Sequence, residues 1–179
     1  MARSYRIRTT PCATDMPHPL YRFDTPDAIL DWGPVDDVVM GGVSRSTFRH
    51  DPDGHAVFEG VVSLERNGGF ASVRSRPRAL GVAGASACVL EVRGDGKWYK
   101  LNLRTDALYD GVNYQLPFEA PAGVWTTVRL DLARFAATFR GRVVDAPPLD
   151  PARLTQVGLV ISDRQAGPFR LDARAISLE

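Results

Sequence analysis

Apolar and polar residues alternate with a period of two through most of this sequence, and this pattern restricts the possible folds most strongly. Residues 97–105 show it clearly, because Tyr99, Leu101 and Leu103 fall on one face and the residues between them on the other. A strand that is buried on one side has this period, since successive side chains point to opposite faces of a sheet. The other strand candidates are 112–118, 124–132 and 169–174, with weaker alternation at 43–50, 56–63, 69–75, 86–93 and 156–162.

Turn-forming residues separate these candidate strands at short intervals. DPDG at 51–54, NGG at 67–69, GDG at 94–96 and PAG at 121–123 are typical of tight turns. Helix-start patterns occur at Thr25-Pro26-Asp27 and at Asp150-Pro151, but little helical periodicity follows either one. Many short strands with few helices indicate a sandwich or a barrel. We predict an all-β fold, a single jelly-roll β-sandwich with one or two short helices.

The length of 179 residues fits one domain with a sizeable core. The N-terminal residues are rich in Arg and Pro and lack the apolar centre of a secretory signal. We therefore expect a flexible tail at 1–18 and one domain at 19–179. No apolar run approaches the roughly 20 residues of a transmembrane helix, so we predict a cytoplasmic protein. A net charge of +1 argues against nucleic-acid binding, because affinity for nucleic acid depends on positive charge that neutralises phosphates.

Catalytic and metal-binding motifs are missing from the sequence. His18, His50 and His55 lie in the N-terminal segment or beside the DPDG turn, and we expect them to be exposed loop residues. There is no Gly-x-Ser-x-Gly, HExxH, CxxC or EF-hand pattern, so we expect no cofactor and no metal. Acidic residues near several turns leave a loop-bound calcium ion as the less favoured alternative. Cys88 lies among apolar residues and is predicted to be a buried, inert thiol.

Two segments have patterns that ordinary strand packing does not explain. Residues 36–44 combine two adjacent acids, an apolar triplet and a Gly pair, which indicates an irregular loop. This loop is either a contact loop for a partner or a crossover between strands. The polar face of 97–105 carries Trp98 beside Lys100, Asn102 and Arg104. Such a face could bind a sugar, but a partly covered outer sheet face is the more ordinary interpretation.

Several motifs, in order, resemble the complex I intermediate-associated protein 30 family. They are WGPVDDVVMGGVSRSTF (32–48), FEGVVSLERNGGFASVRS (58–75), VRGDGKWYKLNLRTD (92–106), FRGR (139–142) and LVISDRQAGPFRLD (159–172). The resemblance implies a galactose-binding-domain-like jelly roll. It also implies a role like that of the mitochondrial members, which act as assembly factors or chaperones for respiratory complex I. With this resemblance, we expect a bacterial cytoplasmic protein that associates with membrane complexes through protein partners.

The resemblance supplies no catalytic residue, but positions in these motifs can be proposed as an interaction surface. The candidate surface consists of Asp36, Asp37, Met40, Ser44, Asn67, Arg74, Arg93, Asp95, Trp98, Arg104, Asp163 and Gln165. Our main hypothesis is a non-enzymatic domain that binds protein subunits or assembly intermediates.

Two other hypotheses remain open from the sequence. The first is a carbohydrate- or small-molecule-binding module, which requires an open cleft that contains Trp98. The second is an enzyme that uses clustered acids such as Asp37, Glu65 and Asp163, which would have to converge in one pocket.

Overall fold

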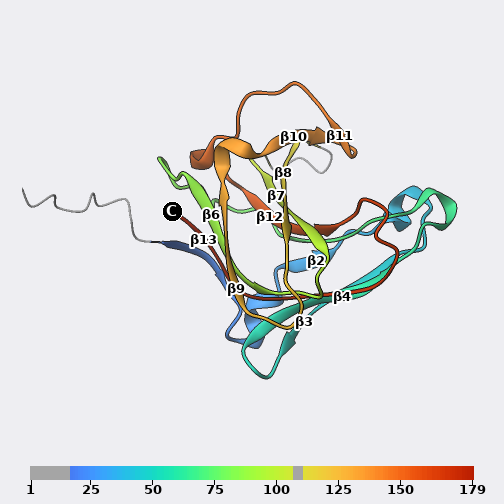
Figure 1. Ribbon diagram of the computed structural model, residues 1–179. Helices are drawn as coiled ribbons and strands as arrows, with labels where there is room; N and C mark the ends of the chain where they lie inside the picture. Colours follow the sequence, from blue (N-terminus) through green and yellow to red (C-terminus); the bar gives the residue numbers. More distant parts are fainter. Residues whose placement is uncertain (1–16, 107–110) are drawn as a thin grey trace, which may run out of the picture.

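Two antiparallel sheets pack face to face in the computed structural model, which describes residues 17–106 and 111–179 (Figure 1). Sheet A has the strand order β3-β4-β13-β6-β9, with β1 paired to β13, and sheet B has the order β11-β10-β8-β7-β12-β5-β2. The domain is therefore an all-β jelly-roll sandwich, as predicted. Residues 1–16 of the predicted tail lie outside the described residues, and the first described strand begins at His18, one residue before the predicted domain boundary.

The strand bounds follow the alternation closely. Sheet A consists of β1 (His18–Arg22), β3 (Arg45–Asp51), β4 (His55–Val62), β6 (Ala87–Arg93), β9 (Thr126–Asp131) and β13 (Gly167–Leu178). Sheet B consists of β2 (Trp32–Pro34), β5 (Ala71–Ser75), β7 (Trp98–Arg104), β8 (Asn113–Glu119), β10 (Ala136–Phe139), β11 (Arg142–Val143) and β12 (Gln156–Ile161). All nine predicted strands are present in the structure. The four that were not predicted are β1, β2, β10 and β11, which have five residues or fewer.

The core lies between the two sheets and is built from the apolar face of each strand. Tyr99, Leu101 and Leu103 of β7 are fully buried, and Leu116 and Phe118 of β8 lie on the same face. Removing these side chains from water is the main stabilising contribution to such a fold. Cys88 is buried in the same core, as predicted, and burial raises the pKa of its thiol to about 12.

The helices that the structure describes are short 3-10 turns of three or four residues. They are η1 (Pro26–Ile29), η2 (Asp37–Met40), η3 (Glu65–Asn67), η4 (Leu132–Arg134) and η5 (Pro151–Arg153). The two predicted helix starts produce η1 and η5, and at η5 the side chain of Asp150 accepts a hydrogen bond from the amide of Ala152. In the described ranges, no helix has the length and apolarity that a membrane crossing requires.

Three loops come together at one end of the sandwich, on the right of Figure 1, and we call them the loop cluster. They are residues 35–44, which include η2, residues 63–70, which include η3, and residues 162–166. Strand register places them together, because Ile161 pairs with Ala71 and Gly167 pairs with Val62. The amide of Val35 donates to the carbonyl of Ser72, which holds the first loop beside β5.

Candidate functional site

Two adjacent carboxylates fasten the loop cluster from the inside. Asp36 accepts hydrogen bonds from the amide and hydroxyl of Ser46, at 2.8 and 2.7 Å, and from the amide of Ser72 at 3.1 Å. Asp37 accepts from the amide of Ser44 at 2.9 Å and from its hydroxyl at 2.5 Å. The two acids in the sequence therefore join η2 to strand β3 and to the start of β5.

Asp37 also reaches across to the second loop. Its Oδ2 accepts from the amide of Gly69 at 2.7 Å and from that of Phe70 at 3.3 Å, and the residue is 1% exposed. Burial by itself would raise the pKa of Asp37. The hydrogen bonds from Ser44, Gly69 and Phe70 outweigh burial and hold that pKa below its usual value. The carboxylate is thus stabilised in its charged form at the centre of the loop cluster.

The two Gly pairs of the sequence, 41–42 and 68–69, leave space for the Asp37 carboxylate. Gly41 and Gly69 have positive φ angles of 90° and 141°, which side-chain-bearing residues rarely adopt. A Cβ added at Gly42 would collide with the Asp37 carboxylate, and one at Gly68 would lie 2.7 Å from Asp37 Oδ2. Each pair therefore provides one turn and one close approach to Asp37.

The outer surface of the loop cluster is partly apolar. Met40 is 67% exposed and Val38 is 59% exposed, and both lie on η2. Trp98, at the start of β7, is 51% exposed. Its backbone amide and carbonyl both bond to the side chain of Gln165, at 3.0 and 2.7 Å. The third loop is thereby fixed beside Trp98.

Polar groups accompany these apolar side chains. Asn67 is exposed on η3, and Asp163 is exposed beside Lys100, whose Nζ lies 2.8 Å from its Oδ1. Asn67 and Asp163 have positive φ angles of 59° and 61°, so both turns hold their side chains in unusual backbone conformations. Eight of the predicted surface residues belong to this region. They are Asp36, Asp37, Met40, Ser44, Asn67, Trp98, Asp163 and Gln165.

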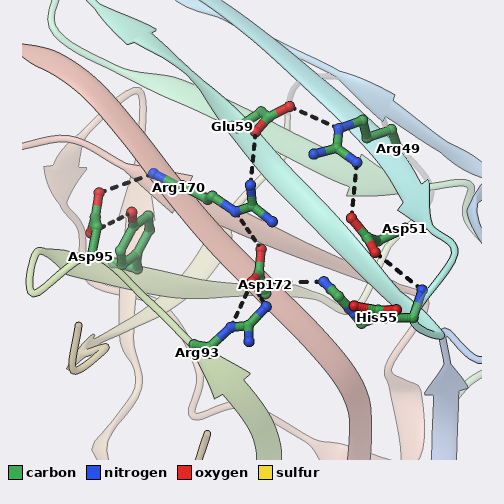
Figure 2. Close-up of polar contacts among 10 residues, drawn as sticks. Arg49, Asp51, His55, Glu59, Arg93, Asp95, Arg170 and Asp172 are labelled. Atoms are coloured by element: carbon green, nitrogen blue, oxygen red, sulfur yellow. Dashed lines mark hydrogen bonds and ion pairs between the residues drawn. The ribbon is translucent and has the colours of Figure 1, made fainter. Parts of the chain in front are cut away.

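A second group of polar side chains lies on the outer face of sheet A and centres on Asp172 (Figure 2). Asp172 is 2% exposed. Arg93 donates to its Oδ2 from Nε at 2.8 Å and from Nη2 at 2.6 Å, and Arg170 donates to its Oδ1 at 2.8 Å. These charge-assisted bonds compensate for the burial of the carboxylate. Arg93 thus takes part in a structural ion-pair network.

Trp125 completes this network. The guanidinium carbons of Arg93 and Arg174 lie 4.8 and 3.9 Å from its ring centroids, and the ring of His55 meets it edge-on at 5.4 Å. His55 Nε2 lies 3.7 Å from Asp172 Oδ2. His55 is 2% exposed, so the prediction of an exposed loop histidine is wrong at this position. It begins β4, where the strands and Trp125 cover it.

Asp95 links the network to the turn before β7. Its Oδ2 accepts from the amide of Arg170, and its Oδ1 accepts from the amide of Lys97 and from the hydroxyl of Tyr99. Burial, together with the Asp95 charge, raises the pKa of Tyr99. Asp95 therefore acts as a turn carboxylate that bonds the backbone around it.

The sequence did not mark Asp172, Arg170 or Trp125 as candidate site residues, and it indicated His55 only as an exposed loop residue. The alternation at 169–174 places Arg170, Asp172 and Arg174 on one face, which is the signal that could have identified this row. Nothing in the sequence pairs that row with Arg93 of a distant strand.

Arg74 and Arg104 lie away from the loop cluster, on the outer face of sheet B, where both line a cleft. Arg104 is 2% exposed, and its Nη2 donates to Asp106 Oδ1 at 2.9 Å. The expectation that Arg104 is an exposed interface residue is therefore wrong. Alternation placed it correctly on the outer face, but it gave no information about the groups that cover this face.

Among the described residues, the three acids of the enzyme hypothesis do not converge, and the cleft that contains Arg74 does not include the tryptophan of the carbohydrate hypothesis. Trp98 is not among the residues that line the cleft with Arg74. Asp37 is buried with its oxygens engaged, whereas Glu65 and Asp163 are exposed, and Asp163 is paired with Lys100. Among the described residues, no three His, Cys, Asp or Glu side chains are grouped as metal ligands would be.

Comparison with known families and curated proteins gives consistent results. The family described as complex I intermediate-associated protein 30 matches residues 21–173. The mitochondrial complex I intermediate-associated protein 30 of Drosophila melanogaster is 25% identical over 185 residues, which cover 89% of this chain and 62% of that protein. A probable counterpart in Caenorhabditis elegans is 28% identical and covers 85% of this chain and 51% of its own length. The chain thus spans about half to three-fifths of these relatives.

Solved structures with the same fold include carbohydrate-binding modules. The family 11 module of the Clostridium thermocellum cellulase Lic26A-Cel5E has a TM-score of 0.66 at 11% identity, covering 90% of this chain and 94% of the module. The same type of module in complex with a mixed-linked tetrasaccharide has a TM-score of 0.65 at 13% identity, with the same coverage. At these identities the likeness shows the shared jelly-roll fold alone.

Proposed function

The chain belongs to the complex I intermediate-associated protein 30 family, and on that premise we propose that it is a protein-binding assembly factor. In this role it binds a subunit or an assembly intermediate of respiratory complex I and catalyses no reaction itself. The proposed contact surface is the exposed part of the loop cluster, with Val38 and Met40 as its apolar centre and Trp98 at its side.

One observation carries this proposal: η2 presents two exposed apolar side chains on a loop that is fixed from within. Met40 is 67% exposed and Val38 59% exposed, while Asp37 beneath them is 1% exposed and accepts four hydrogen bonds. A loop held in this way loses little conformational entropy when a partner binds. Methionine and tryptophan are also enriched at protein interfaces, where they fill apolar pockets on the partner.

The surroundings of η2 supply the polar rim that such an interface needs. Asn67, Asp163 and Gln165 lie on the neighbouring loops, with polar groups near the surface. A rim of this kind contributes orientation and solubility more than affinity. Asp36, Asp37 and Ser44 support the surface from below and have no direct contact with the partner in this proposal.

The proposal is tested by affinity capture from membranes of the organism that carries this chain, followed by quantitative mass spectrometry. We expect the wild-type protein to recover complex I subunits, and Met40→Glu to reduce that recovery about tenfold or more. A charge placed in the apolar centre of an interface costs at least as much as a typical hot-spot truncation.

Val143→Glu is the matched control, because Val143 is 77% exposed on β11 at the far edge of sheet B. It adds the same charge at a position outside the loop cluster that is at least as exposed as Met40, so we expect normal recovery. If Met40→Glu recovers as much as wild type, or if both variants lose recovery equally, the loop cluster is not the contact surface.

A further inference from the structure

Two turns of the loop cluster share an unusual backbone conformation. Among the residues that the structure describes, five other than glycine have positive φ angles, and four of these five lie in the loop cluster. Arg66 and Asn67 have φ angles of 52° and 59° in the second loop, and Asp163 and Arg164 have φ angles of 61° and 60° in the third. Each of these loops therefore turns through two consecutive residues in the left-handed region.

The four residues differ in how well they suit this conformation. Glycine adopts it freely, and Asn and Asp tolerate it because their short polar side chains can hydrogen-bond to the backbone nearby. Arginine has no such compensation, and its Cβ comes close to the following carbonyl oxygen. Asn67 and Asp163 are thus suited to their positions, whereas Arg66 and Arg164 are not. An unfavourable residue at an exposed turn indicates a role for its side chain.

The fold places both arginines near the apolar centre of the proposed contact surface. The second loop is bonded to η2, because Asp37 Oδ2 accepts hydrogen bonds from the amides of Gly69 and Phe70. The third loop lies beside the second, because β12 pairs with β5 and β13 pairs with β4 where the two loops begin and end (Figure 1). Arg66 and Arg164 are exposed on these two loops.

Most acids of the loop cluster already bind donors of this chain. Asp36 and Asp37 accept hydrogen bonds from backbone amides, and Asp163 Oδ1 lies 2.8 Å from Lys100 Nζ. Glu65, the remaining acid of the three loops, is exposed and directly precedes one of the two arginines. The exposed edge of the loop cluster thus presents two guanidinium groups, which are permanently charged and can only donate hydrogen bonds.

We propose that Arg66 and Arg164 bind carboxylate groups of the partner, so that the loop cluster recognises an acidic amphipathic segment of a protein subunit. This inference rests on the proposed function and specifies the chemistry of its partner. Val38 and Met40 pack against the apolar side of that segment, and the two guanidiniums bind acidic side chains along its border. Arginine suits this task because its planar donors can hold both oxygens of a carboxylate, and it is enriched at protein interfaces.

The test repeats the affinity capture over a range of bait concentrations with the double variant Arg66→Gln/Arg164→Gln. We expect the bait concentration that gives half-maximal recovery of complex I subunits to rise about tenfold, because charge-assisted hydrogen bonds are lost. Glu65→Gln is the matched control, since it removes the opposite charge from an exposed residue of the same loop. It should leave that concentration unchanged or lower it, because a carboxylate here repels an acidic partner.

The double variant Arg66→Gly/Arg164→Gly separates binding from folding. Glycine adopts the left-handed conformation without strain, so we expect a melting temperature near that of the wild type or above it. Recovery of complex I subunits should nevertheless fall as it does in Arg66→Gln/Arg164→Gln. A clear drop in melting temperature would show that the arginines support the loops instead, and would overturn the proposal.

The remaining outcomes distinguish this inference from the proposed function. Unchanged recovery in Arg66→Gln/Arg164→Gln, or an equal loss in Glu65→Gln, would overturn the acidic partner alone if Met40→Glu still loses recovery. Normal recovery in Met40→Glu would overturn the contact surface and this inference with it. Sedimentation with phosphatidylglycerol vesicles provides the last arm: binding of the wild type that is lost in Arg66→Gln/Arg164→Gln would assign the arginines to a lipid surface and contradict the proposal.

Discussion

Single buried residues determine the shape of the loop cluster, and Asp37 is the most informative of them. We predict that Asp37→Asn lowers the free energy of unfolding by about 3 kcal/mol, because an amide nitrogen replaces one of two oxygens that accept four hydrogen bonds. Urea denaturation at neutral pH measures this loss. A change below about 1 kcal/mol would contradict the assigned role.

The same residue gives a pH dependence with a definite sign. The pKa of Asp37 is lowered in the folded chain, so its stabilisation is complete above the unfolded-state pKa of about 3.9 and is lost as the pH falls through the lower folded value. We therefore expect the stability of the wild type to fall more steeply than that of Asp37→Asn below about pH 4. Parallel curves for the two proteins would show that the carboxylate does not titrate as described.

Arg104 supplies a second prediction at this scale. Arg104→Ala should lower the free energy of unfolding by about 2–4 kcal/mol, because it removes a 2%-exposed side chain and leaves Asp106 without this partner. Arg142→Ala, at an exposed position on β11, should change it by less than about 0.5 kcal/mol. Thermal denaturation of both variants distinguishes a buried from an exposed arginine, and equal melting temperatures would contradict the burial of Arg104.

At the scale of elements, strand β7 tests whether the alternation marks the core. Leu101→Ala should cost about 2–5 kcal/mol, since Leu101 is fully buried between β8 and β12. Lys100→Ala, on the opposite face, removes an ion pair with a well-exposed Asp163 and should cost about 1 kcal/mol or less. Chemical denaturation of the two neighbouring variants measures the difference, and similar losses would be inconsistent with the assigned faces.

The strands could be predicted from the sequence because side-chain alternation is a local property. Each of the nine predicted strands matches one in the structure, whereas β2 and β11 have three and two residues and are too short to show a period. Alternation could not predict which side chains on the outer faces of the two sheets are buried. His55 and Arg104 are buried by residues far away in the sequence, and local patterns do not reveal such covering groups.

The candidate surface could be predicted only in part, because local patterns do not show contacts between distant segments. The segment 36–44 was recognised as irregular, and Met40 is indeed exposed there. Asp36 and Asp37 turn inward because their hydrogen-bond donors lie on β3, on β5 and in the 63–70 loop. A pair of acids in sequence does not indicate whether it faces solvent or supports a loop from within.

At the scale of the whole molecule, one jelly-roll domain carries two surfaces, which share Val35. The loop cluster lies at the end where β5 begins and β12 ends, and the arginine-lined cleft lies on the outer face of sheet B. Carbohydrate-binding modules share this fold at 11–13% identity, so the fold by itself does not specify a ligand. The functional proposal is therefore supported by family membership and by the exposed residues on η2.

Site-specific photo-crosslinking tests the central claim most directly. A photoreactive p-benzoylphenylalanine placed at position 40 or, as a control, at position 143 would be activated in cells of the source organism while complex I is being assembled. Both positions are well exposed, at 67% and 77%, so their intrinsic reactivity is comparable. We expect a discrete crosslink from position 40 to a complex I subunit and none from position 143. A crosslink to that subunit from position 143 alone, or no crosslink from position 40, would contradict the proposed contact surface.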